Sequence, residues 1–158
     1  MNIDSDPSDR MPSAARQLMY QALVAMPEWR DRFRGGYCCL NEVTHVNTGT
    51  PDEPIHVRAT STLSIYWIRE KDFHPDQLTL RTLSVDRAFR ERPGSFKAND
   101  RYVIGFASNI GELADDAIAA MLALVMNLAD LSSVEKKLAE NPHGLKLLTQ
   151  IDSYRVSL

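Results

Sequence analysis

The side chains best suited to proton transfer, metal binding or nucleophilic attack are four histidines and two cysteines. The histidines are His45, His56, His74 and His143. None of them forms a His-x-x-x-His pair, and the cysteines do not form a Cys-x-x-Cys pair, so no spacing typical of a metal site is present. A Cys–His nucleophilic pair would need a contact in space that spacing does not show. We therefore expect no metal and no cofactor.

Cys38 and Cys39 are adjacent in a segment that reads as a strand. Neighbouring residues of a strand point to opposite faces, so these two cysteines cannot easily form a disulfide with each other. Free cysteine behaves mostly as a small hydrophobic residue. We expect two buried thiols and a chain that folds in a reducing cytoplasm.

A long alternating stretch, residues 55–67, is the clearest strand. Its apolar residues are Ile55, Val57, Ala59, Leu63, Ile65 and Trp67. Its polar residues are His56, Arg58, Thr60, Thr62, Ser64 and Tyr66. The stretch is longer than a usual strand, which predicts a bulge or bend between Ala59 and Thr62.

The polar side of this strand has two interpretations. It is either an ordinary solvated sheet face or a binding surface that includes His56, Arg58 and Tyr66. If His45 on the preceding strand lies beside His56, the two imidazoles would suit acid–base chemistry, although the sequence fixes no carboxylate to orient either ring.

Residues 86–101, which contain Pro93-Gly94 and are predicted to be one long loop, form the sharpest local feature, with five basic and three acidic residues in a chain whose net charge is −3. The basic residues are Arg87, Arg90, Arg92, Lys97 and Arg101, and the aromatic residues Phe89 and Phe96 lie between them. Basic groups with aromatics suit an acidic protein surface or a nucleic acid. The alternative is a solvated loop whose phenylalanines turn back into the core.

These residues must be positioned by a surrounding fold, and the longest nearly apolar segment, residues 113–131, is its expected core helix. Asp115, Asp116, Asn127 and Asp130 fall on one strip of this helix, together with Ala119, Ala120 and Ala123. The remaining surface is apolar and must pack on a sheet, a helix or a partner. Asn109 with Glu112 resembles a capping box that opens the helix, and Ser132 with Glu135 resembles a second one.

The order of elements predicts an α+β domain. A helix from Ala14 to about Ala25 is followed by a turn of helix at Pro27 and strands at 37–46, 55–67, 78–85 and 102–107, mostly antiparallel. Two C-terminal helices complete the domain, and the tail at 154–158 would suit an edge strand. Residues 1–13, rich in Asp and Pro, are expected to be a flexible arm, and residues 14–158 a single domain.

No segment is long and apolar enough to span a membrane, and the acidic N-terminus has no apolar signal core, so we expect a cytoplasmic protein without a membrane partner. Glycine-rich phosphate loops, a nucleophile elbow and a calcium loop are absent from the sequence. These absences make an enzyme the less expected class, and they favour an interaction or assembly protein whose partner is another protein or a second copy of the chain.

Several segments resemble the plasmid and phage antirestriction family. These are a helix followed by Phe33-Arg-Gly-Gly-Tyr37, then Ala114-Asp-Asp-Ala117, Leu138-Ala-Glu-Asn-Pro-His143 and Ile151-Asp152. The present chain has a much longer strand region between the first of these segments and the others. The resemblance implies an inhibitor of a host defence enzyme, or a protein that faces nucleic acid. A small-molecule enzyme that uses the polar strand side is the third interpretation.

Overall fold

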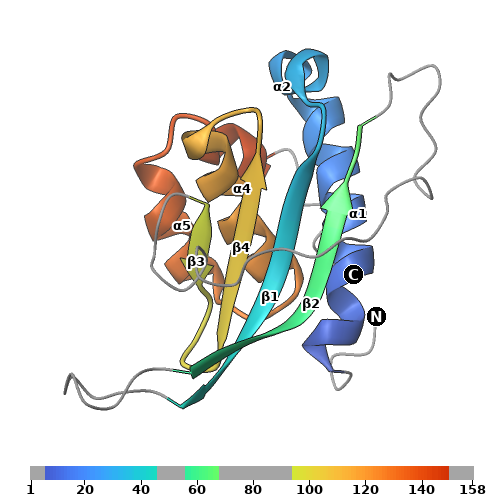
Figure 1. The fold of residues 1–158 in the computed structure, drawn as a ribbon. Coiled ribbons are helices and arrows are strands. Elements are labelled where there is room, and N and C mark those ends of the chain that lie inside the picture. Colours follow the sequence, from blue (N-terminus) through green and yellow to red (C-terminus); the bar gives the residue numbers. More distant parts are fainter. Residues whose placement is uncertain (1–5, 46–55, 68–93, 150–158) are drawn as a thin grey trace.

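The computed structural model describes residues 6–45, 56–67 and 94–149. The elements are α1 (Pro7–Ala25), α2 (Pro27–Arg32), β1 (Gly36–His45), β2 (His56–Ile65), β3 (Ser95–Lys97), β4 (Tyr102–Ser108), α4 (Glu112–Val125) and α5 (Leu131–Ala139). Residues 144–149 are also helical. No described helix could cross a membrane. The α+β prediction is confirmed (Figure 1).

Within the described residues the sheet has four antiparallel strands in the order β2-β1-β4-β3. The predicted strands at 78–85 and 154–158 lie outside the described residues. β3, by contrast, lies inside the segment that was predicted to be one long loop. Its three residues pair with Val103, Ile104 and Gly105 of β4, and a strand this short is defined by its distant partner and not by any local pattern.

The predicted bulge between Ala59 and Thr62 is confirmed. Ser61 lies opposite Leu40 and Ala59 lies opposite Asn41, which leaves Thr60 as the extra residue. The Thr60 hydroxyl donates a hydrogen bond to the Leu40 carbonyl at 3.0 Å. Because an extra residue reverses the facing of all residues beyond it, the alternating polar residues of β2 do not form one continuous face.

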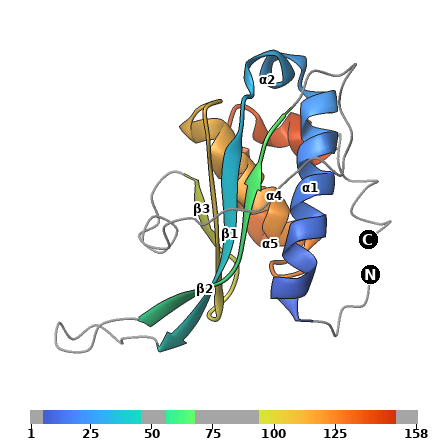
Figure 2. The same cartoon turned by 45° about the vertical axis from the view of Figure 1, so that its right-hand side comes forward.

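One face of the sheet carries the main core. Its buried residues are Cys38, Leu40, Leu63, Ile65, Ile104 and Phe106. α1 packs on β1 and β2, while α4 packs on β3 and β4, and both helices lie on this side of the sheet (Figure 2). On the opposite face Cys39 and Val103 form a smaller cluster with Val43. The two cysteines are free and fully buried on opposite faces, as predicted.

α1 begins earlier than the sequence indicated. Asp6 caps the helix by accepting a hydrogen bond from the Ser8 backbone at 2.9 Å, and Pro7 occupies the first turn, where its missing N–H costs nothing. Met11 is completely buried, and Arg10 donates to the Met126 carbonyl at 2.9 Å. The prediction of a flexible arm over residues 1–13 is therefore wrong for residues 7–13, which belong to the folded domain.

α4 is shorter than the predicted helix 113–131. It ends because Asn127 adopts a φ of 60°, and the backbone N–H of Leu128 then reaches the Ala123 carbonyl at 3.0 Å. This hydrogen bond is typical of a helix C-terminal cap in which one residue adopts the left-handed conformation. Asparagine tolerates that conformation better than most residues. Asp130 then starts α5 by accepting from the Ser133 backbone at 2.8 Å, in place of the predicted Ser132 cap.

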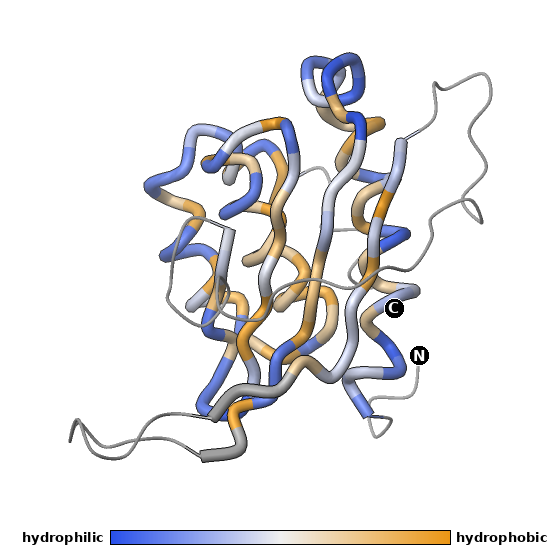
Figure 3. The backbone as a smooth tube through the Cα atoms, in the orientation of Figure 1, coloured by the Kyte–Doolittle hydropathy of each residue, from blue (hydrophilic) through white to orange (hydrophobic). Residues whose placement is uncertain are grey.

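α4 is also buried on nearly all sides. α1, α5, β3 and β4 all contact it, and Ala119, Ala120 and Ala123 have no exposed surface. The side of the helix that was predicted to be polar is therefore covered. Hydrophilic colours gather instead on α2, whose sequence is mostly charged (Figure 3).

Candidate functional site

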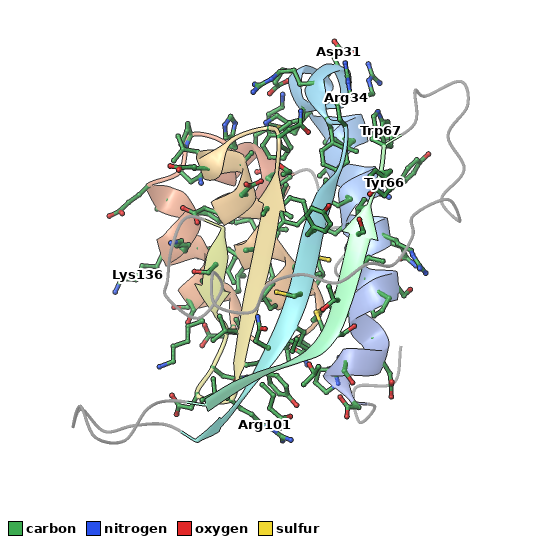
Figure 4. The ribbon with its side chains drawn as sticks, viewed as in Figure 1. Asp31, Arg34, Tyr66, Trp67, Arg101 and Lys136 are labelled. Atoms are coloured by element: carbon green, nitrogen blue, oxygen red, sulfur yellow. The ribbon has the colours of Figure 1, made fainter. Side chains whose placement is uncertain are left out.

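Two of the predicted binding residues, Lys97 and Arg101, flank the turn between β3 and β4. Both side chains are exposed. Figure 4 shows Arg101 at one end of the sheet, while Asp31, Arg34 and Trp67 lie at the other end. Arg87, Phe89, Arg90 and Arg92, which complete the predicted basic loop, lie outside the described residues. The β3–β4 turn and its contacts are therefore the part of the predicted basic loop that the structure describes.

The turn itself is held by the side chain of Asn99. Its Oδ1 accepts hydrogen bonds from the backbone N–H groups of Arg101 and Tyr102, each at 2.8 Å. Its Nδ2 donates to the Leu128 carbonyl at 3.2 Å, in the connection between α4 and α5. An asparagine that satisfies two backbone donors in this way is a common means of fixing a tight turn. The turn is thus attached to the helical layer as well as to the sheet.

The Arg101 side chain is exposed, but contacts with Glu42 and Tyr102 fix its direction. Its side chain is 67% exposed, and its Nη2 lies 3.2 Å from Oε2 of Glu42, whose side chain is 17% exposed. The guanidinium carbon lies 5.2 Å from the centre of the Tyr102 ring, and the Tyr102 hydroxyl donates to the same Glu42 oxygen at 3.4 Å. Exposed ion pairs contribute only about 0–1 kcal/mol to stability. The main effect of these contacts is therefore to fix the direction of the guanidinium.

The charges around Arg101 are of both signs. Burial raises the pKa of Tyr102, the Arg101 charge opposes that rise, and the charges of Glu42 and Asp6 add to it. The pKa of Asp6 is lowered, first by the backbone hydrogen bond from Ser8 and to a smaller extent by the charge of Arg101. Three acidic side chains, those of Asp6, Glu42 and the exposed Asp100, therefore accompany the basic groups.

The segment that leads into this turn is anchored at Gly94. Its N–H donates to Asp116 at 2.5 Å, and its carbonyl accepts from the Phe106 N–H at 2.6 Å. Two features favour glycine at position 94. Its φ of 95° is rarely adopted by residues with a side chain, and an added Cβ would clash with the Phe106 carbonyl oxygen. Phe96 is half-buried against the main core. At this position, the alternative in which a phenylalanine turns inward is the one observed.

The polar residues in the second half of β2, an edge strand, do not form a fully solvated surface. Ser64 is fully buried, Thr60 and Thr62 are half-buried, and the ring of half-buried Tyr66 lies against Gly35, where an added Cβ would be 2.9 Å from Tyr66 Cδ1. His56 and Arg58 are located by register alone, opposite His45 and Glu42. The structure thus places His45 directly across from His56, the arrangement that the sequence left open.

The cysteines do not have the properties of nucleophiles. Burial raises the pKa of Cys38, and burial also raises the pKa of Cys39, although hydrogen bonds from Asn41 and Gly105 act in the other direction. A reactive cysteine needs a lowered pKa and access to solvent. Next to Cys39, Asn41 is fully buried, donates to the Val103 carbonyl at 3.3 Å, and has no partner for its Oδ1.

Sequence reasoning missed Glu42, which orients Arg101. The two residues are far apart in the chain, and they meet because Glu42 pairs with Tyr102 in the β1–β4 ladder. No local pattern reports such a pairing. Among the described residues, no group of three or more His, Cys, Asp or Glu side chains is placed to hold a metal ion.

Comparisons of the chain with protein-family models, with curated proteins and with solved structures found no match. The resemblance to the antirestriction family therefore depends on the short segments quoted above and stays a prediction.

Proposed function

We propose that this chain is a non-catalytic interaction protein that docks on another protein through the β3–β4 turn, with Arg101 at the centre of the contact. The observation that carries the proposal is the state of Arg101, which is 67% exposed and yet oriented by Glu42 and Tyr102. Arginine is enriched among the residues that dominate protein interfaces. A side chain that is already oriented loses less conformational entropy on binding.

A protein partner fits this surface better than a nucleic acid does. Single-stranded nucleic acids are bound by exposed aromatic rings within a basic groove. Here Phe96 packs against the core and Tyr102 is only 7% exposed. The carboxylates of Asp6, Glu42 and Asp100 would also repel a polyanion, whereas a protein surface can present charges of both signs in complementary positions.

The experiment compares capture of partners from native lysate by three forms of the full chain. The first is the wild type, and the second carries Lys97→Ser and Arg101→Ser. The control carries Lys136→Ser and Lys137→Ser, which removes two exposed lysines of α5. Figure 4 shows Lys136 apart from Arg101, on the helical side of the molecule. We expect a protein that wild type and control capture and that the Lys97/Arg101 variant loses. Its retention should fall as NaCl is raised, because contacts between exposed charges are screened.

A second variant separates orientation from charge. Glu42→Gln keeps Arg101 exposed but removes the carboxylate that holds it, so partner binding should weaken while the melting temperature changes little. Equal capture by all variants at every salt concentration would contradict the proposal. A gel shift with unrelated DNA or RNA that requires Arg101 would favour the nucleic-acid interpretation instead.

A further inference from the structure

A second pair of exposed basic side chains lies at the end of the sheet opposite to the β3–β4 turn. Arg32 is the last residue of α2, and Arg34 lies between α2 and β1. Both side chains are exposed. α2 lies at one end of the molecule (Figure 1), and Figure 4 shows Arg34 at this end and Arg101 at the other. The two arginines therefore belong to a surface that is separate from the β3–β4 turn.

Backbone carbonyl groups orient both guanidinium groups. Arg32 Nη2 donates a hydrogen bond to the Ile110 carbonyl at 3.1 Å. Arg34 Nη1 donates to the carbonyls of Asp31 and Phe33, each at 3.2 Å. Among the described residues, no carboxylate forms an ion pair with either arginine. A carbonyl group directs a guanidinium without neutralising its charge, so both arginines keep their charge and further donors for an external anion.

Asn109 holds the backbone from which these two side chains extend. Its Nδ2 donates to the Arg32 carbonyl at 2.7 Å, and its Oδ1 accepts from the Arg34 backbone N–H at 2.9 Å. The next residue, Ile110, supplies the carbonyl that binds the Arg32 guanidinium. The connection between β4 and α4 thus fixes both arginines. A side chain that is fixed before binding loses less conformational entropy when a partner binds.

Aromatic side chains lie beside the arginines. The Tyr66 ring packs against Gly35, the residue after Arg34, where an added Cβ would be 2.9 Å from Tyr66 Cδ1. Figure 4 shows Tyr66 and Trp67 on the same part of the molecule as Arg34, and both residues are half-buried. Arginine, tryptophan and tyrosine are the residue types most enriched among those that dominate protein interfaces.

We propose that Arg32 and Arg34 form a second docking surface, which binds an acidic segment of a partner protein through its carboxylate groups. The donors of a guanidinium form a planar fork that matches a carboxylate. The exposed acids Glu28 and Asp31 would repel a polyanion such as a nucleic acid, whereas a protein segment can place single carboxylates on the two arginines. Because the β3–β4 turn lies at the other end, a chain with both surfaces joins two partners.

The test is a fluorescence anisotropy titration with labelled hexaglutamate as the acidic probe, at low salt. Every titration uses the full chain with Lys97→Ser and Arg101→Ser, so the result does not depend on the function proposed for the β3–β4 turn. Adding Arg32→Gln and Arg34→Gln should weaken binding about tenfold, the scale expected for the loss of two exposed charge contacts. The matched control adds Lys136→Gln and Lys137→Gln, which removes the same charge from α5, and should bind within about twofold of the parent chain.

A further variant, Asn109→Ala, tests the orientation of the arginines. It keeps both charges but removes the side chain that holds their backbone, so hexaglutamate binding should weaken by a smaller factor, about threefold. Circular dichroism before each titration establishes that the variants are folded. Labelled hexaglutamine should not bind, because it lacks the carboxylates.

Three results would overturn the proposal. The first is the absence of saturable hexaglutamate binding to the parent chain. The second is equal binding by the Arg32/Arg34 variant and the lysine control. The third is tighter binding of a labelled oligothymidylate than of hexaglutamate through the same two arginines, which would identify the partner as a nucleic acid.

Discussion

Ser108 at the end of β4 and Asp115 in the first turn of α4 are joined by two hydrogen bonds. The Ser108 hydroxyl donates to Oδ1 at 2.5 Å and its backbone N–H donates to Oδ2 at 3.1 Å. The neighbouring Asp116 accepts from Gly94 at the entry to β3. The N-terminal part of α4 therefore binds β4 and the residue that precedes β3 through two consecutive aspartates. Its N-cap, Gly111, has no side chain that could bond the helix end.

Replacing Asp115 by Ala should destabilise the domain by about 2–4 kcal/mol, because two hydrogen bonds to a carboxylate are lost and the Ser108 N–H is left without its partner. The measurement is urea unfolding followed by circular dichroism. Glu112→Ala is the control, since Glu112 shares the favourable end of the helix dipole but is exposed. A cost for Asp115→Ala no larger than that of Glu112→Ala would show that the hydrogen bonds contribute little.

Ala119→Asp should prevent stable folding, as should Leu124→Asp. Both positions are buried, and an unpaired carboxylate in such a site costs several kcal/mol. Thermal unfolding and size-exclusion chromatography measure the effect. Ser132→Asp, on the exposed side of α5, should change the free energy of unfolding by no more than about 0.5 kcal/mol. A near-normal melting temperature for Ala119→Asp would mean that α4 has an open side.

Stability should fall as the pH rises above the usual thiol pKa of 9.0. Burial raises the folded-state pKa of Cys38 and Cys39, so in this range the unfolded chain releases protons that the folded chain keeps. The cysteine contribution is complete below the unfolded pKa and is lost as the pH rises toward the folded pKa, at up to about 1.4 kcal/mol per pH unit for each thiol.

Denaturant unfolding between pH 7 and 10.5 checks this slope. The double variant Cys38→Ala and Cys39→Ala should start less stable, because it leaves small cavities, but should show a flatter alkaline decline. Parallel pH profiles for wild type and variant would remove the thiols as the cause and leave Tyr102, whose pKa burial also raises.

Local patterns predicted much of the fold. The break between α1 and α2 at Pro27, the first two strands, the bulge at Thr60 and the strand β4 all follow from residues that are neighbours in sequence. The end of α4 was missed because Asn127 stops the helix inside an apolar run. Asn109 was assigned to a capping box, but it bonds the Arg34 N–H and the Arg32 carbonyl across the fold.

The candidate site was predicted only in part for the same reason. Lys97 and Arg101 were recognised from composition, but the contacts of Arg101 with Glu42 and the opposition of His45 and His56 depend on strand register. Register depends on bulges and on which strands become neighbours, and both are properties of the whole sheet. The spacing of residues along the sequence predicts neither the bulges nor the neighbouring strands.

The central place of β1 has a consequence for synthesis of the chain. β2 follows β1 closely, but the other edge of β1 is paired by residues 102–108. On the ribosome that edge stays open until β4 has emerged, and unpaired strand edges in nascent chains promote aggregation. The interval between translation of β1 and translation of β4 is therefore the time in which this edge of the nascent chain is open to aggregation.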